Sequence, residues 1–380
     1  MKILFLSQGR RIEDHPGWEW ALAKLKTEGV VNDYHNIPWI GYGEQHGWSM
    51  LYKHVVDVAA YSRFDVIYFH YFHRYGVPSA IDCIEKLRSL QHSPIVVTSI
   101  GDAYADRRLP FLSRKFPECF RTIASRSDIV FSTQMGRTAN IILEWGARNV
   151  VLSPNSLCPV RFKNCTVDPL IHKFDFDVVM VGSRNGGRWN PFSEYSIRSR
   201  ERNKIVRMLS DHFGKKFAVF GNGWEGCVSN QGPVSFDSQQ RVLQMGRICV
   251  GGNPYSYDDY YSSNRVFFEI ASGIPTIELR VPRLDKMFRA GYHCHFIDAV
   301  DDVVAKCEEL LHCNPVELYR TAASAAKDIS ERHTQYHRMK FMVDVIRRYC
   351  DTRNLEGVGL PFFLPETDFC KERQFAIRSR

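Results

Sequence analysis

The sequence has no long hydrophobic run, no paired-cysteine motif and no strong excess of any residue type. The longest apolar run near its start is Ile3 to Leu6, far below the roughly 7–15 residues of a signal-peptide core or the roughly 18 of a membrane span. These absences predict a cytoplasmic protein without a transmembrane segment. The eleven cysteines are odd in number, and none forms a Cys-x-x-Cys pair. Buried free thiols are therefore expected, in place of a disulfide framework or a zinc site.

The composition is that of an ordinary folded protein. Of 380 residues, 44% are hydrophobic and 24% are charged, which excludes collagen-like, coiled-coil and wholly disordered chains. At about 150 residues per domain, two or three domains are expected. The net charge of +8 suits an anionic ligand, a nucleic acid or an acidic membrane face, so peripheral membrane association stays open.

The first 155 residues alternate short apolar runs with amphipathic stretches. Runs without polar alternation, separated by helices, are typical of a parallel sheet covered on both faces. The expected strands are 2–7, 65–70, 94–100, 128–133 and 149–152, with helices at 17–26, 80–90 and 137–145.

A second α/β series follows a stretch that contains Pro154, Pro159 and Pro169. Its expected strands are 177–181, 216–220, 248–251 and 275–278, and its expected helices are 197–213, 264–272, 301–312, 315–330 and 334–350. We therefore expect an N-terminal Rossmann-like domain over 1–155, a linker over 156–175 and a second Rossmann-like domain over 176–333. A helix and tail over 334–380 are expected to pack back on the first domain.

Two glycine turns follow strands of the second domain. The segment from Gly221 to Gly226 matches the G-x-G-x-x-G dinucleotide fingerprint, but residues 227–235 read as loop where the fingerprint needs a helix. Gly182 and Ser183 end the preceding strand, and their loop carries Arg188. Glycine lets backbone N–H groups come close to phosphate oxygens, and an arginine guanidinium can pair with a phosphate. This loop is therefore a candidate diphosphate site. The arginines of the next helix, including Arg202, are expected on its solvated face.

The segment 261–277, YSSNRVFFEIASGIPTI, holds the most informative constellation. Asn264 and Arg265 fall at an expected helix start, where the helix dipole and free N–H groups favour phosphate. Glu269 follows Arg265 by one turn, so the two share a face. A carboxylate there can accept hydrogen bonds from both hydroxyls of a ribose, while the arginine binds the phosphates. The alternative is an ordinary surface salt bridge.

Two candidate catalytic residues follow strands of the first domain. Asp102 lies in a Gly-Asp turn after the strand 94–100 and could act as a base or orient a hydroxyl, or simply cap the next segment. His70 ends the strand 65–70 and is either a second catalytic candidate or a member of an aromatic cluster with Tyr71 and Phe72.

The segment 261–277 resembles the nucleotide-sugar signature of group 1 glycosyltransferases, in particular the CgeB-like branch, with the pattern N-R-x-F-E-x-x-A/S-x-G. Further similar pieces, in the family's order, are SIGDAYAD, SDIVFST, SPNS, VMVGS, FGNGW, LDKMFRAG and ERHTQYHRM, the last resembling a closing H-T-x-x-x-R helix. The resemblance covers nearly the whole chain. It departs from the broader pattern at Tyr261, where many group 1 enzymes carry a second glutamate; Asp258 and Asp259 are nearby carboxylates.

The resemblance implies the GT-B fold, with two Rossmann-like domains facing across a cleft. By it, Glu269 binds the donor ribose, while Arg265 and the Gly182–Ser183 backbone hold the diphosphate. It implies a glycosyltransferase moving sugar from a nucleotide diphosphate sugar, expected to be a UDP-sugar, to a hydroxyl acceptor such as a cell-surface glycan. Retention, no metal and no cofactor are expected. The alternatives are transfer to modified DNA bases or an inactive GT-B binding protein. The DNA alternative is suggested by the net charge of +8 and by the arginines and aromatic residues of the first half, including Arg107, Arg108, Arg114 and Lys115.

Overall fold

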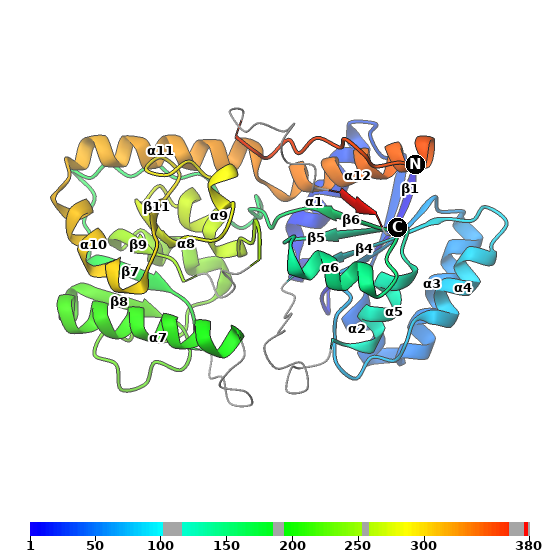
Figure 1. Ribbon diagram of the computed structural model, residues 1–380, viewed down its shortest axis with the longest axis horizontal. Coiled ribbons are helices and arrows are strands. Elements are labelled where there is room, and N and C mark those ends of the chain that lie inside the picture. The colour runs from blue at the N-terminus through cyan, green and yellow to red at the C-terminus, as the bar shows by residue number, and fades with distance from the viewer. Residues whose placement is uncertain (102–115, 185–193, 253–257, 365–375, 379–380) are drawn as a thin grey trace.

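The computed structural model describes residues 1–101, 116–184, 194–252, 258–364 and 376–378. They form two lobes, each an open twisted sheet with helices on both faces (Figure 1). This confirms the expected α/β class with two Rossmann-like halves.

The sheet of the first lobe has the order β12-β6-β5-β4-β3-β1-β2. All its pairings are parallel except that of β12 with β6, so the chain's last described strand adds an antiparallel edge. Its strands are β1 (Lys2–Ser7), β2 (Asp33–Pro38), β3 (Val66–His70), β4 (Ile95–Ile100), β5 (Ile129–Ser132), β6 (Asn149–Leu152) and β12 (Ala376–Arg378).

Neighbouring residues of β1 show how this sheet is covered on both faces. Phe5 points to the face packed by α1 and the last long helix, whereas Leu4 and Leu6 point to the face packed by α2, α3 and α4. This explains the unbroken apolar runs. The helices of this lobe are α1 (Pro16–Thr27), α2 (Trp39–His46), α3 (Trp48–Ser62), α4 (Ile81–Ser89), α5 (Glu118–Arg126) and α6 (Arg137–Glu144).

The sheet of the second lobe has the order β11-β10-β9-β7-β8 and is wholly parallel among the described strands. Helices α7 and α10 cover one face, and α8, α9 and α11 cover the other. The strands are β7 (Phe176–Val181), β8 (Phe217–Phe220), β9 (Gly246–Val250), β10 (Thr276–Leu279) and β11 (His295–Ile297). The helices are α7 (Glu194–Phe213), α8 (Gln239–Leu243), α9 (Asn264–Ala271), α10 (Val303–His312) and α11 (Pro315–Arg332).

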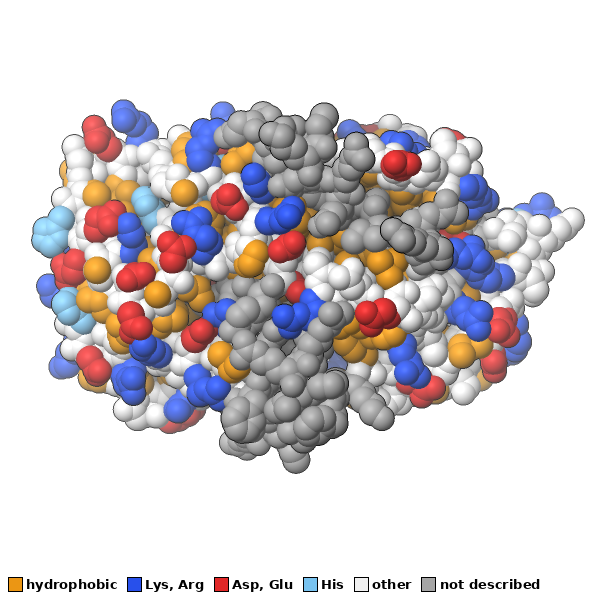
Figure 2. Space-filling view, viewed as in Figure 1, with side chains coloured by type: hydrophobic (Ala, Val, Ile, Leu, Met, Phe, Trp, Pro, Cys, Tyr) orange, Lys and Arg blue, Asp and Glu red, His pale blue; other side chains and the backbone are white. Residues whose placement is uncertain are grey.

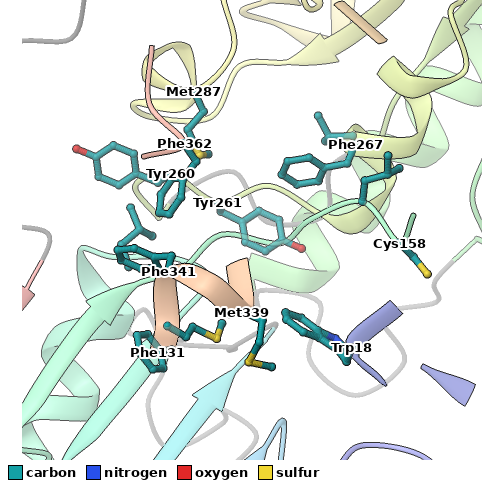
Figure 3. Close-up of a cluster of buried hydrophobic side chains, with 14 of the residues drawn as sticks. Trp18, Phe131, Cys158, Tyr260, Tyr261, Phe267, Met287, Met339, Phe341 and Phe362 are labelled. Atoms are coloured by element: carbon teal, nitrogen blue, oxygen red, sulfur yellow. The ribbon is translucent and has the colours of Figure 1, made fainter. Parts of the chain in front are cut away.

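Two of the segments that pass between the lobes, the one after β6 (the first crossing) and the one after α11 (the second crossing), lie side by side. The second crossing leads into α12 (Gln335–Thr352), which lies on α1 of the first lobe (Figure 1). The two crossings touch, because Leu157 and Thr334 form an isolated parallel bridge. Buried side chains from both lobes meet here in one continuous cluster, with Trp18 and Phe131 on one side and Tyr261 and Phe267 on the other (Figure 3).

The sequence patterns missed several elements of this fold. Strand β2 (DYHNIP) is half exposed at a sheet edge and lacks the apolar run of a buried strand. Helices α2 and α3 are separated only by Gly47, which has a φ of +91° and starts the second helix in a new direction. Helices α5 and α8 and strands β11 and β12 were also not expected.

Candidate functional site

Two glycine turns meet at the carboxyl ends of β7 and β8. The Gly182 amide donates to the Phe220 carbonyl (2.8 Å), and the Trp224 indole N–H donates to the Gly182 carbonyl (2.7 Å). A Cβ on Gly221 would lie 2.4 Å from the Gly182 oxygen, so only glycine fits there. Residues 227–235 after this turn form no helix, so the segment 221–226 is not a dinucleotide-binding fingerprint, which needs a helix there. The Gly182 amide is occupied within the sheet, so a phosphate beside it must be held by other groups.

Arg202 of α7 fixes the backbone around these turns. Its side chain is only 4% exposed and donates to the carbonyls of Ser183 (3.0 Å) and Gly252 (2.5 Å). The expected solvated position of Arg202 was wrong. Its spacing of three and seven residues from the buried Ile205 and Leu209 is the helical signal that places it on the inner face.

Arg265 lies over the first of these turns. It is in the first turn of α9, and its Nη1 would be 3.7 Å from a Cβ built on Gly182. It makes no hydrogen bond or ion pair within the described part of the chain. Ser263, the N-cap of α9, provides no capping hydrogen bond, and its buried hydroxyl has no partner. An uncommitted guanidinium at an uncapped helix start is suited to binding an anion.

Asn264 faces a different space from Arg265. It lines a cavity of about 220 Å³ between the lobes, together with His15, Phe268 and Gln335. The cavity joins the start of α9 to the start of α1, so residues of both lobes surround it. Asn264 therefore lies between the lobes, and its expected role in phosphate binding stays a prediction.

Glu269 does not face the same space as Arg265. Its side chain is fully buried, and its carboxyl group finds no partner within the described residues other than the carboxyl group of Glu278. The family pattern has its glutamate three residues after the arginine, where this chain has Phe268. The offset of one residue turns Glu269 by about 100° around the helix, toward the sheet. Ribose binding by Glu269 requires its carboxyl group to become exposed, and it stays a prediction.

Glu269 instead meets a second buried acid, Glu278 of β10. A Cβ on Gly251 would lie 1.9 Å from Glu278 Oε1, so this carboxyl group occupies the space that a side chain at 251 would need. Burial raises the pKa of both carboxyl groups, and the neighbouring Glu269 raises that of Glu278 further, whereas Arg265 and Arg202 act in the opposite direction. The pair therefore retains a proton at pH values where exposed glutamates have lost theirs.

Stability is expected to fall with rising pH because of this pair. The folded protein keeps the Glu278 proton above the ordinary pKa of 4.5, so unfolding releases protons and the free energy of unfolding decreases as pH rises. E278Q should reduce this decrease between pH 5 and pH 8 by about 1 kcal/mol or more in urea denaturation. E225Q, at an exposed site, is the control. An equal pH dependence in wild type and E278Q would contradict the shared proton.

His70 lies away from any surface that a substrate could touch. It is fully buried, and its ring centroid lies 4.8 Å from that of Trp18, 5.1 Å from that of Phe5 and 4.1 Å from that of Tyr71. Burial lowers its pKa well below the ordinary value, and neither ring nitrogen has a partner. A general base must reach the proton that it removes. The geometry therefore fits the aromatic-cluster interpretation and not the catalytic one. Asp102 and Arg188 lie outside the described residues.

The carboxylates near Tyr261 are used in other contacts. The Thr138 hydroxyl of the first lobe donates to Asp258, and Asp259 lies 3.5 Å from Arg283. Tyr261 itself is fully buried. Asp258 therefore joins the lobes, which no sequence signal indicated.

Metal-binding clusters, membrane-spanning helices and surface charge were compared over the described residues. These residues contain no group of three or more His, Cys, Asp or Glu side chains that could hold a metal ion. No helix among them has the length and apolarity to cross a bilayer. Basic and acidic side chains are interspersed over both lobes on the face seen in Figure 2. The basic residues that suggested a DNA acceptor, Arg107, Arg108, Arg114 and Lys115, fall outside the described part.

Residues 198–344, from α7 into α12, match a family model described as glycosyl transferase-like. This segment contains Arg202, Arg265 and Glu269. A search of curated proteins finds no match. The assignment to the CgeB-like branch stays a prediction.

Solved structures share the fold across both lobes. HepE from Anabaena, solved with UDP and glucose, has a TM-score of 0.55 at 12% identity over 91% of this chain and 99% of its own. A glycosyltransferase from Rickettsia africae has a TM-score of 0.54 at 8% identity, covering 93% and 99%. A protein described as a UDP-N-acetylglucosamine 2-epimerase from Listeria monocytogenes has a TM-score of 0.54 at 11% identity, covering 92% and 96%. The family match covers the second lobe and the start of α12, and the solved structures show that the two-lobed GT-B fold extends over both lobes.

Proposed function

We propose that the protein transfers a sugar from a nucleoside diphosphate sugar to a hydroxyl acceptor such as a cell-surface glycan. The observation that carries this proposal is the uncommitted Arg265 guanidinium over the Gly182 turn, at the positive end of α9. In open α/β sheets, ligands bind beyond the carboxyl ends of the strands, where this arginine lies. The diphosphate is the part of the donor that it would hold.

Uridine is the proposed base of the donor. The solved structures of similar fold include HepE with UDP and with UDP-glucose, both at 12% identity. These structures are the basis for proposing uridine, because no residue in the described part of the chain identifies the base.

The chemistry at the donor requires stabilisation of the negative charge that develops on the departing diphosphate. Arg265 and the free N–H groups at the start of α9 are preorganised positive groups of the kind that lower such a barrier. Arg202 keeps the flanking carbonyls of Ser183 and Gly252 engaged, so that they do not face the phosphates. The proposed reaction therefore needs no metal ion. Retention of the anomeric configuration follows the resemblance to group 1 enzymes.

A panel of donors tests this function. The purified protein is incubated with UDP-, GDP-, ADP- and dTDP-sugars, with and without EDTA, and the released nucleotide is measured. We expect release from a UDP-sugar above the others and no effect of EDTA. If no nucleotide is released from any donor, the proposed function is refuted. Release only from sugars linked to another nucleotide would refute uridine as the base. Loss of release in the presence of EDTA would refute metal independence.

A further inference from the structure

Arg338, in the first turn of α12, is a buried charge that meets no acidic side chain among the described residues. Its side chain has no exposed area, and no carboxylate in the described part of the chain forms an ion pair with it. Its Nη1 is buried and has no hydrogen-bond partner. Burial lowers its pKa to about 9, so it still carries its charge at neutral pH. This group was expected only as the last member of the closing H-T-x-x-x-R segment.

Within the described residues, its guanidinium contacts Pro154, His333 and Phe362, which belong to three separate segments. Nε donates to the carbonyl of Pro154 in the first crossing between the lobes (3.0 Å), and Nη2 lies 2.9 Å from Nδ1 of His333 in the second. The Phe362 ring, from the segment after α12, lies 4.3 Å from the guanidinium carbon. Burial and the neighbouring arginine lower the pKa of His333 well below its ordinary value, so the imidazole is neutral and accepts this hydrogen bond.

The same two crossings are joined by backbone hydrogen bonds. The Leu157 amide donates to the His333 carbonyl (2.8 Å), and the Gln335 amide donates to the Leu157 carbonyl (2.9 Å). Arg338 therefore reinforces a short parallel bridge where these two segments pass between the lobes. A guanidinium suits this place because its rigid fork reaches two acceptors at once.

Arg338 also connects to the donor helix. Phe267 of α9 lies 5.9 Å from the Arg338 guanidinium, and its ring lies 5.8 Å from that of His333. On the opposite side, the Tyr71 hydroxyl after β3 donates to the side-chain oxygen Oδ1 of Asn155 (3.3 Å). The side-chain Nδ2 of Asn155 donates in turn to the Ser262 carbonyl just before α9 (2.8 Å). These contacts connect the end of β3 in the first lobe with α9, the helix that carries Arg265.

Stability alone does not explain this arginine. A buried charge that no opposite charge compensates costs folding free energy, and replacing buried ionic groups with well-packed apolar ones is often neutral or stabilising. A methionine of similar length would fill the same space among Phe267 and Phe362 without this cost. What it would lack is the pair of directed hydrogen bonds that fixes the two crossings against each other.

We propose that Arg338 is a positioning residue for glycosyl transfer: by holding Pro154 and His333 together, it fixes the donor helix α9 relative to the strand ends of the first lobe. The proposal rests on the proposed function, because it assumes that the donor bound at α9 reacts with a group held by the first lobe.

The test compares R338M with K340M, a control that removes an exposed charge on the same helix. R338M should keep or raise the melting temperature and bind UDP by calorimetry like wild type. Its kcat for release of UDP from UDP-glucose should fall about tenfold, which corresponds to ~1.4 kcal/mol of lost transition-state stabilisation. K340M should match wild type throughout. Unchanged kcat in R338M would overturn the proposal, as would a loss of UDP affinity and melting temperature that accounts for the lower rate.

A second pair of variants does not depend on R338M folding. In H333N, the side-chain oxygen can replace Nδ1 as an acceptor for Arg338, and kcat should stay near wild type. H333L removes the acceptor and should lower kcat as R338M does. Equal kcat in H333N and H333L would overturn the proposal.

Hydrogen exchange separates failure of this proposal from failure of the proposed function. The amides of Leu157 and Gln335 should exchange faster in R338M than in K340M. If wild type neither binds UDP nor hydrolyses UDP-glucose, the proposed donor is wrong, while faster exchange would still support Arg338 as the clamp of the crossings. Unchanged exchange would overturn that role whatever the donor.

Discussion

Alanine at position 221 is expected to abolish measurable UDP binding and to lower the free energy of unfolding by about 2–4 kcal/mol. The new Cβ would lie 2.4 Å from the Gly182 oxygen, 2.6 Å from its carbonyl carbon and 2.8 Å from the Ser183 nitrogen. All three are backbone atoms, so no side chain can rotate away. Either the turn after β8 or the end of β7 must move, and each move displaces the turn beneath Arg265.

Gly226 supplies the control for this prediction. It has a φ of +84°, and a Cβ there would meet nothing within 4 Å. G226A therefore carries only the cost of a left-handed backbone, about 1 kcal/mol, and should keep UDP affinity. Urea denaturation and calorimetry measure both variants. If G221A and G226A lose the same stability and both bind UDP, the contact between the two turns does not shape the donor site.

Removal of the Arg265 guanidinium should weaken UDP binding by about 10- to 100-fold, which is the loss of one charge-assisted hydrogen bond worth roughly 1.5–3 kcal/mol. Because Arg265 makes no hydrogen bond or ion pair within the described residues, R265A should leave the melting temperature near that of wild type. Binding and stability thus separate at this residue, whereas they fall together in G221A.

The control for R265A is R241A, which removes an exposed arginine of α8 in the same lobe and changes the net charge equally. Calorimetry with UDP at two salt concentrations distinguishes a direct contact from a general field effect, because exposed long-range attraction is screened by salt. If R265A binds UDP as tightly as R241A does, the proposed diphosphate site is wrong, and with it the observation on which the proposed function depends.

The Glu269–Glu278 pair adds a second constraint on the same site. One retained proton leaves the pair with a smaller negative charge than two free carboxylates would have, close enough to Arg265 and Arg202 for these to act on both acids. Full ionisation would place more negative charge close to the proposed diphosphate position and oppose its binding. A raised pKa of Glu278 therefore suits an anionic donor, and E278Q tests the proton through stability alone, independently of any ligand.

The local sequence determined the framework of this protein. Apolar runs without alternation, such as 2–7 and 94–100, can be buried on both faces only in a covered parallel sheet, so they predicted the strands and the fold class. Glycine at 182 and 221 and the arginine at the start of α9 marked the carboxyl end of the second sheet for the same reason, because strand, turn and helix signals are local in the chain.

Only the tertiary structure decided which way the decisive side chains point and what they meet. Glu269 shares a helix with Arg265 but faces Glu278, nine residues later on another element, and His70 ends a strand yet lies among rings from β1 and α1. Arg338 finds partners 184 residues earlier in the chain and on either side of the lobe boundary. Periods of 2 and 3.6 residues fix a side chain's face within its own element, whereas its neighbours come from segments brought together by packing, which no local pattern encodes.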